Sequence, residues 1–479
     1  MTHHVEKKVL PLWRIPAMRQ TYVILGPMSL IFSAGVFMGT STVMMPQLKK
    51  DDSDIYVSES MSAWLYSVNG IGSMPTVLLV PYISQWKGYK LTFVLICLPV
   101  IIAFILHLFA TNAVHLLIAG LCQGVTMGGN ISLGIISITE YAEPRLRSFF
   151  LVMKSASFFW GIWTGNIIGT FSYWRNIPLL GIWPALFALF SCIIWPEGPY
   201  WLASVGRIEE CKKSFVWLRG PENDKDELAA IIKNQTKNSD NSGKSNLVSK
   251  IKKSAVCRQF YMPFAVNCVL YSLYQFSGKI VMTVYALVII EDITKSESTA
   301  YAGMLLIDGV TVVGMYIGSY VAMNVRRRNM FLITSAVTIF FLYVLCLYLS
   351  LVAYDVVTQN NVVSLTLLVL YTFAVSWGPM VLSTSFTSEI APMRFKAFIV
   401  AVGSCVFWGL QTANLRLAPI LMANVGMHGS FGIYGTFTLL FWIYLYKYLP
   451  ETNNKTLQEL ELCFVKDKDK RKMDDVIEN

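Results

Sequence analysis

Three charged side chains lie inside long apolar stretches of this sequence, where charge is costly and therefore informative. Lys279, Asp308 and Arg416 each have apolar neighbours over a length that would cross a bilayer. Burying such a charge costs at least about 2.5–3.5 kcal/mol, so each needs a partner or a water-filled cavity. If successive stretches run in opposite directions, Lys279 and Asp308 reach a similar depth, and we expect them to form an ion pair. We expect Arg416 near the mouth of the same region.

A second group consists of amide, hydroxyl and aromatic side chains in the same stretches. An amide matches both the donor and the acceptor of a solute hydroxyl, and an aromatic face covers the apolar side of a ring. Helix packing is the alternative role for every member of this group. The residues that we expect to contact a small solute are Gln275, Trp408, Ser277, Tyr274, Ser155 and Asn414.

No motif typical of an enzyme or a metal site occurs in the sequence. There is no HExxH, no GxSxG and no Walker loop, and the nine cysteines stand singly without a CxxC pair. Apolar packing is the expected role of those cysteines. We therefore expect no catalytic activity, no cofactor and no bound metal.

The composition indicates a bilayer as the solvent. Apolar residues make up 54% of the chain and charged residues only 14%, with a mean hydropathy of +0.52. Soluble proteins carry about 25% charged residues, so a globule of this composition could not cover itself with polar surface. The net charge of +10 is scattered over short connections. It forms no basic face interleaved with aromatic residues, which argues against nucleic-acid binding.

Twelve apolar runs, each near the length of about 20 residues that a membrane helix needs, fall into two groups of six. The first six lie near 21–45, 61–83, 91–111, 114–139, 149–172 and 177–195, and the last six near 260–290, 300–323, 330–353, 361–388, 397–424 and 427–449. This pattern predicts an all-α membrane protein. Its predicted parts are an N-terminal segment 1–20, a six-helix bundle 21–196, a loop with short helices 197–258, a second six-helix bundle 259–449 and a tail 450–479.

Basic residues alternate between the connections and predict the orientation. Lys and Arg gather in every second connection, for example Arg326 to Arg328, whereas the intervening ones are acidic or nearly neutral. Cytoplasmic loops carry an excess of Lys and Arg. We therefore expect both termini and the segment 197–258 in the cytoplasm, with the plasma membrane as the default location.

Two sequence repeats relate the halves of the chain. Pro-Glu follows both the sixth and the twelfth run, and an acid and a base seven residues apart around a proline follow both the fourth and the tenth. Parallel repeats of this kind occur in transporters, where the substrate site lies between the halves. We predict pseudo-twofold symmetry about the membrane normal and a cytoplasmic gate formed by these corners. The corner residues are Glu140, Arg147, Glu389, Lys396, Glu197 and Glu451.

With these motifs the chain resembles the sugar porter family of the major facilitator superfamily, and within it the insect-type facilitated trehalose transporters. PEGPYWLASVGRIEECKKSFVWLRG, residues 196–220, is similar to the family's Pro-Glu-Ser-Pro-Arg segment and its following helices. PETNNKTLQELE, residues 450–461, is similar to its terminal Pro-Glu-Thr-x-Gly-Lys-Thr-Leu-Glu-Glu. The resemblance implies the major facilitator fold, transport by alternating access, and sugar contacts from Gln275 and Trp408. The first run contains no acid, which favours facilitated over proton-coupled transport.

The sequence differs from the family pattern in two regions. They are the motifs that contact sugar and the cytoplasmic turn that takes part in closure. The seventh-span motif Gln-Gln-x-Ser-Gly-x-Asn is YQFSGKI at 274–280, and Phe407 stands where an asparagine precedes the tryptophan. Ser155 stands where the fifth span of the family often has a glutamine. The turn after the second span reads QWKGYK at 85–90 and lacks the family's acid and two of its arginines. We expect a weaker cytoplasmic closure and a resting state biased to inward-facing.

Three functions stay open on the sequence. The first is a carrier for a sugar or sugar-like small solute of the trehalose or hexose class. The second is a non-transporting membrane sensor or receptor with a degenerate sugar site, and the third is a carrier of a non-carbohydrate small solute. In each case we expect a small-molecule solute and the lipid bilayer as partners, with no obligate protein partner.

Overall fold

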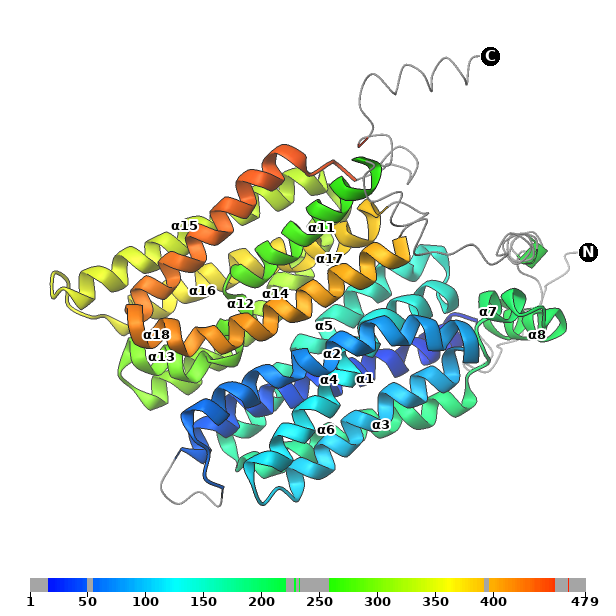
Figure 1. The fold of residues 1–479 in the computed structure, drawn as a ribbon, viewed down its shortest axis with the longest axis horizontal. Coiled ribbons are helices and arrows are strands. Elements are labelled where there is room, and N and C mark those ends of the chain that lie inside the picture. Colours follow the sequence, from blue (N-terminus) through cyan, green and yellow to red (C-terminus); the bar gives the residue numbers. More distant parts are fainter. Residues whose placement is uncertain are drawn as a thin grey trace, which may run out of the picture.

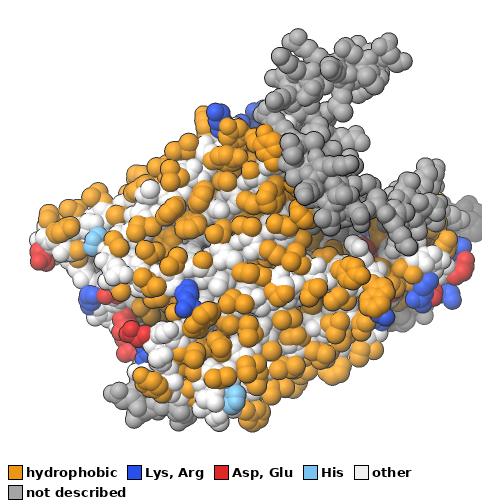
Figure 2. Space-filling model, in the orientation of Figure 1, with side chains coloured by type: hydrophobic (Ala, Val, Ile, Leu, Met, Phe, Trp, Pro, Cys, Tyr) orange, Lys and Arg blue, Asp and Glu red, His pale blue; other side chains and the backbone are white. Residues whose placement is uncertain are grey.

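The computed structural model of the 479-residue chain describes residues 16–49, 55–220, 228–229, 232, 258–391, 396–452 and 464. Helices are the only regular secondary structure in this part of the chain. They form two bundles that lie side by side (Figure 1). On the face shown in Figure 2, hydrophobic side chains cover the middle, and charged side chains lie mostly toward the ends. This is the surface that a bilayer-spanning protein presents to lipid.

The first bundle contains six long helices joined by short connections. Ser58 and Asn112 begin two of these helices, and their side chains accept hydrogen bonds from the backbone N–H groups of Met61 and His115. The helices of the first bundle are α1 (Pro16–Leu48), α2 (Glu59–Lys87), α3 (Tyr89–Leu108), α4 (Ala113–Tyr141), α5 (Pro144–Phe171) and α6 (Ile177–Ile194), with the short 3-10 helix η2 (Trp174–Asn176) before α6.

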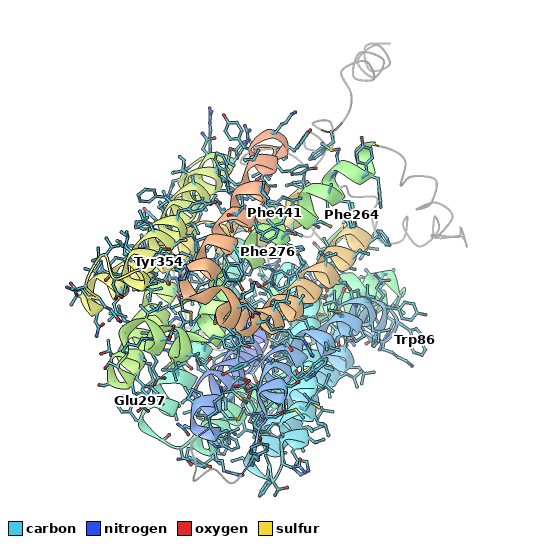
Figure 3. All side chains as sticks on the ribbon, turned by 60° about the vertical axis from the view of Figure 1, so that its left-hand side comes forward. Trp86, Phe264, Phe276, Glu297, Tyr354 and Phe441 are labelled. Atoms are coloured by element: carbon cyan, nitrogen blue, oxygen red, sulfur yellow. The ribbon has the colours of Figure 1, made fainter. Side chains whose placement is uncertain are left out.

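Two short helices lie against one end of the first bundle. They are α7 (Pro199–Ser204) and α8 (Ile208–Arg219), at the right of Figure 1. The Trp201 indole donates to the Gln85 carbonyl at 2.8 Å, and Arg19 donates to the Trp217 carbonyl at 2.8 Å. We call this end of the molecule the α8 end and the opposite one the far end. In Figure 3, Trp86 marks the α8 end and Tyr354 marks the far end.

The second bundle has more broken helices than the first. Gly278, with φ +79°, separates α11 from α12, and Gly426, with φ +74°, breaks α18 into two segments. Such backbone angles are accessible to glycine at little cost. The helices of the second bundle are α11 (Arg258–Phe276), α12 (Lys279–Val284), α13 (Ala286–Thr294), α14 (Glu297–Asn324), α15 (Arg327–Ala353), α16 (Asn361–Trp377), α17 (Pro379–Ile390) and α18 (Lys396–Tyr448).

The helices account for the twelve predicted spans. Among the described residues, nine helices are long and apolar enough to cross a membrane, and α11–α12 with α13, bent by 78°, makes a tenth. Gly426 divides the 53 residues of α18 into two crossings. The last crossing is α5, which has 28 residues but a more polar sequence that includes Lys154. The prediction of a twelve-helix, multi-pass membrane protein in two six-helix bundles is confirmed.

Candidate substrate site and gates

The two bundles touch each other from mid-height to the far end. There α2 lies along α18, and α5 lies along α14. The rings of Tyr66 and Tyr285 are 4.3 Å apart, and the Thr42 hydroxyl donates to the Thr283 carbonyl at 3.3 Å. One hydrophobic cluster contains residues of both bundles, for example Leu65 of the first and Ile289 of the second. The far end is therefore closed in this conformation.

The bundles separate toward the α8 end. Asn166 and Ser155 are eleven residues apart on α5, which is about three turns, so they share one face of that helix. Asn166, nearer the far end, is buried against the second bundle, whereas Ser155 is exposed. The described hydrophobic clusters nearest the α8 end each take residues from one bundle only. The conformation is closed at the far end and open at the α8 end.

The prediction that Lys279 and Asp308 form an ion pair is wrong, because each side chain bonds to a different residue. The Lys279 ammonium donates to the Thr311 hydroxyl at 2.7 Å, and the Asp308 carboxylate accepts from the Asn166 amide at 2.6 Å. Asp308 and Thr311 lie one turn apart on α14, so the predicted similarity in depth holds. Lys279 directly follows the break at Gly278, and its side chain bonds to Thr311. The Asp308 carboxylate bonds instead to Asn166 of the first bundle.

Arg416 contacts an aromatic ring of the opposite bundle. Its guanidinium carbon lies 3.7 Å from the centroid of the Trp64 ring, and Trp64 belongs to the far-end part of α2. A cation over an indole face contributes about 0.5–2 kcal/mol, depending on how far it is desolvated. We expected Arg416 near the mouth of the charged region. In the structure it contacts Trp64 of the opposite bundle, and this contact helps to close the far end.

Four polar side chains of the second bundle form a connected group at mid-height. The Gln275 amide donates to the Phe407 carbonyl at 3.2 Å and to Gln411 Oε1 at 3.4 Å. Asn414 donates to the Gln275 carbonyl at 2.7 Å and accepts from the Tyr434 hydroxyl at 2.9 Å. Two predicted site residues, Gln275 and Asn414, are thereby brought together.

Trp408 lies where this polar group meets the first bundle. Its side chain is buried in a hydrophobic cluster with Ile31, Met127 and Phe158 of the first bundle. Its indole Nε1 and Gln275 Oε1 are buried and have no hydrogen-bond partner. Trp408 contacts the first bundle, whereas Gln275 bonds within the second. A free donor and a free acceptor match the two hydrogen-bonding capacities of a hydroxyl group.

The other three predicted solute contacts use their polar groups differently. The hydroxyl of Ser277, just after α11, donates to the Tyr274 carbonyl, and that of Ser155 donates to the Leu151 carbonyl in α5. The Tyr274 ring packs against Phe407 with centroids 5.4 Å apart. Within a bilayer a hydroxyl commonly bonds to a carbonyl one turn earlier, so these contacts need no solute. Ser155 is the one of the three that is exposed.

The sequence analysis missed a fourth charge within the membrane. Lys154 on α5 is 7% exposed, and its ammonium donates to the Asn130 carbonyl of α4 at 2.9 Å. No ion pair of Lys154 occurs among the described residues. The signal was present, because the lysine stands inside the fifth apolar run. It was overlooked because it lies close to the polar start of that run.

Both Pro-Glu glutamates cap the start of a helix in their own bundle. Glu197 accepts from the backbone N–H groups of Tyr89 and Lys90 at 2.6 and 3.1 Å, where α3 begins. Glu451 accepts from the N–H of Arg328 at 3.2 Å, where α15 begins. A carboxylate at a helix N-terminus satisfies free N–H groups and interacts favourably with the helix dipole. The repeated motif therefore stabilises the third crossing of each bundle.

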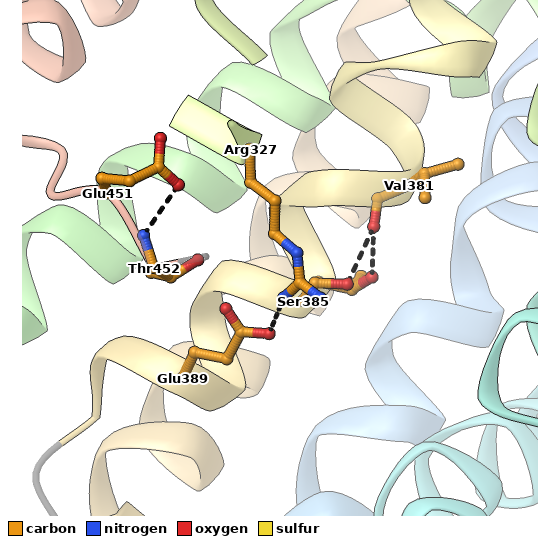
Figure 4. A network of polar contacts seen from close by, with 7 residues as sticks. Arg327, Val381, Ser385, Glu389, Glu451 and Thr452 are labelled. Carbon is orange, nitrogen blue, oxygen red and sulfur yellow. Dashed lines mark hydrogen bonds and ion pairs between the residues drawn. The ribbon is translucent and has the colours of Figure 1, made fainter. Parts of the chain in front are cut away.

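Two of the other corner residues, Glu389 and Glu140, also bond within their own bundles in this conformation. Glu389 forms an ion pair with Arg327, close to Glu451 (Figure 4). Glu140 faces the Tyr89 hydroxyl. The side chains of Arg147 and Lys396 lie outside the described residues. Since the α8 end is open here, a gate formed across the bundles stays a prediction for the opposite conformation.

Known proteins show the same fold and related sequences. The sequence model of the sugar (and other) transporter family matches residues 25–464. The facilitated trehalose transporter Tret1 of Apis mellifera ligustica is 23% identical over 434 residues, which cover 89% of this chain and 84% of the relative. The sugar transporter ERD6-like 6 of Arabidopsis thaliana is 26% identical over 453 residues, covering 92% and 89%.

Among solved structures, two of the xylose transporter XylE share the architecture. The proton:xylose symporter bound to 6-bromo-6-deoxy-D-glucose has a TM-score of 0.73 at 18% identity, covering 93% of this chain and 98% of that one. The inward open conformation from E. coli also has a TM-score of 0.73, at 16% identity and with 94% and 99% covered. The chain thus has the major facilitator fold and belongs to the sugar (and other) transporter family.

Proposed function

We propose that this protein carries a sugar or sugar-like small solute across a membrane by facilitated, alternating access. The observation that carries the proposal is the pair of buried, unpartnered atoms Gln275 Oε1 and Trp408 Nε1, with Trp408 packed where the second bundle meets the first. The relatives named facilitated trehalose transporter make trehalose the first solute to test. No acid occurs in α1, which supports uptake without proton coupling.

Alternating access requires that the far-end contacts break while the α8 end closes. The contacts to be broken are Asn166 to Asp308, Thr42 to Thr283, Tyr66 to Tyr285 and Trp64 to Arg416. A bound solute favours whichever conformation gives it the better contacts. Hydroxyl contacts to Gln275 and Trp408 would hold a solute against the second bundle while the first one moves.

The wall that the first bundle contributes is apolar and limits the kind of solute. Met127, Ile131 and Phe158 pack around Trp408 there. A solute hydroxyl left without a partner costs about 1–3 kcal/mol. We infer that the preferred solute places one polar edge on the second bundle and an apolar face on the first.

The orientation and location follow the predicted charge pattern. The α8 end, where the basic connections lie, would face the cytoplasm, and the plasma membrane is the proposed site. In that orientation the present conformation is inward-facing, which is the resting state that the weakened cytoplasmic turn at 85–90 favours.

Uptake of radiolabelled trehalose and glucose into proteoliposomes tests the proposal. We expect saturable uptake that excess unlabelled sugar blocks, and we expect Gln275→Leu and Trp408→Leu to reduce it strongly. Thr366→Ala is a matched control, because that exposed hydroxyl bonds only to the Val362 carbonyl of its own helix. Binding of sugar without flux would support a sensor. Absence of both binding and flux, with the protein monodisperse, would support a carrier of another solute class.

A further inference from the structure

A lysine is enclosed within the membrane-spanning part of the first bundle. Lys154 lies where α1, α4 and α5 pack together, whereas the next residue, Ser155, is exposed. The Lys154 ammonium donates to the Asn130 carbonyl of α4 at 2.9 Å, and it forms no ion pair with any described residue. Because an ammonium group has three N–H donors, the described residues use its hydrogen-bonding capacity only in part.

An unpartnered acceptor lies beside this ammonium. Asn130 is fully buried, and its amide donates to the Pro27 carbonyl of α1 at 3.3 Å, while its Oδ1 has no hydrogen-bond partner. A Cβ at Gly134 would lie 2.6 Å from Asn130 Oδ1 and 2.8 Å from Lys154 Nζ. The two atoms are therefore close enough for one ligand to contact both, and the glycine leaves room for the ammonium. We call Lys154, Asn130 and Gly134 the Lys154 site.

The Lys154 site lies about one helical turn from the apolar wall of the candidate solute site. On α5, Lys154 precedes Phe158 by four residues, and on α4, Asn130 follows Met127 by three. Both steps lead toward the α8 end, because α4 runs to that end and α5 starts there. Phe158 and Met127 pack around Trp408. A solute that rests on this wall from the open side would place its adjoining group near the ammonium.

A carboxylate on a hydroxylated solute fits both polar groups of the site. Hydrogen bonds from an ammonium to a carboxylate are charge-assisted and about twice as strong as neutral ones. A charge within the membrane is costly unless it is compensated, so an anionic ligand would lower the cost of burying Lys154. A hydroxyl near that carboxylate could donate to Asn130 Oδ1. A neutral sugar would satisfy this acceptor but would leave the charge of the lysine uncompensated.

We propose that the Lys154 site selects sugar acids, which are hydroxylated solutes that carry a carboxylate. Lys154 binds the carboxylate, and Asn130 accepts a hydrogen bond from a hydroxyl. The inference rests on the proposed carrier function and names the class of its solute. It makes Lys154 a specificity-determining residue of the first bundle, whereas Gln275 and Trp408 belong to the second. A single solute would then contact both moving bundles.

Thermal stabilisation of the full-length protein by glucuronate tests the assignment. Glucuronamide is the matched neutral probe, because an amide replaces the carboxylate at nearly the same size. We expect half-maximal stabilisation at a glucuronate concentration at least about tenfold below that of glucuronamide, since a hydrogen bond to a charged group contributes at least this factor. The difference should disappear in Lys154→Met. It should persist in the control Lys87→Met, because that exposed ammonium lies over the Trp86 ring, outside the site.

A second variant keeps the lysine and moves only its ammonium. Gly134→Ala introduces a methyl group where Lys154 Nζ now lies, so it should reduce the preference for glucuronate even if Lys154→Met does not fold. Equal stabilisation of the parent by both probes would refute the assignment, as would a preference that persists in either variant of the site. Saturable trehalose uptake without a preference for glucuronate would leave the carrier proposal standing. A preference that depends on Lys154, without flux of either solute, would do the reverse.

Discussion

Replacing Asn166 by alanine should open the far end of the molecule. Asn166 donates to the Asp308 carboxylate at 2.6 Å, and this bond joins α5 of the first bundle to α14 of the second. Both side chains are buried, at 0% and 4% exposure. In Asn166→Ala the carboxylate stays buried in the closed conformation but loses its hydrogen-bond donor. In the opposite conformation water would solvate it, so the variant penalises closure selectively.

The expected magnitude follows from the charge on the acceptor. Hydrogen bonds to charged groups contribute about 1.5–3 kcal/mol. At about 1.4 kcal/mol per factor of ten, the ratio of far-end-open to far-end-closed molecules should rise about 10- to 150-fold. The second polar contact between these helices, from the Trp160 indole to the Tyr316 hydroxyl at 3.1 Å, is unchanged by the substitution.

Labelling of a cysteine at Thr42 measures the change, because Thr42 is covered only while the far end is closed. Thr170→Ala is the matched control, since that hydroxyl lies one turn away on α5 and donates only to the Asn166 carbonyl of its own helix. Asn166→Asp should label faster still, because it places two carboxylates together. Equal labelling of Asn166→Ala and Thr170→Ala would refute the assignment of this bond as a latch.

Three further outcomes follow from the same interface. Valine at Gly70 should keep the far end from closing and abolish uptake, because a Cβ there overlaps the Thr412 hydroxyl; the reporter at the far end should become reactive. The Lys279 ammonium and the Asp308 carboxylate interact electrostatically although each bonds to another side chain, so Lys279→Met and Asp308→Asn should each lower the free energy of unfolding, and the double variant should lose clearly less than the sum. Arg416→Gln should increase far-end labelling by up to about thirtyfold, since a cation–π contact contributes up to about 2 kcal/mol.

The fold was predictable because a bilayer leaves few solutions. Backbone groups inside lipid must bond within their own helix, so the lengths of the apolar runs translate directly into crossings. The break at Gly426 falls between the predicted runs 397–424 and 427–449, whereas the break at Gly278, inside the predicted run 260–290, was not foreseen because it depends on one residue. The left-handed angles at Gly278 and Gly426 divide α11 from α12 and split α18, and many other glycines in the chain lie within unbroken helices.

The site was only partly predictable, because partner choice depends on helices far away in sequence. Depth along the membrane placed Lys279 and Asp308 at the same level, as the structure has them. It gave no information on α5, which brings Asn166 to the carboxylate, or on the rotation that turns the lysine to Thr311. Likewise, the hydroxyl of Ser277 looked like a solute contact, although the Tyr274 carbonyl three residues earlier satisfies it.

The structure also changes what the repeated corners imply about motion. A carboxylate that caps a helix in its own bundle, as Glu197 and Glu451 do, makes that bundle more rigid and contributes nothing to the energy difference between two orientations of rigid bundles. Only groups whose surroundings differ between conformations can bias the exchange. In this conformation those include the far-end contacts of Asp308 and Arg416, which cross the bundles. The repeated Pro-Glu motifs therefore stabilise each bundle internally. The residues that contact the opposite bundle determine which of the two conformations is favoured.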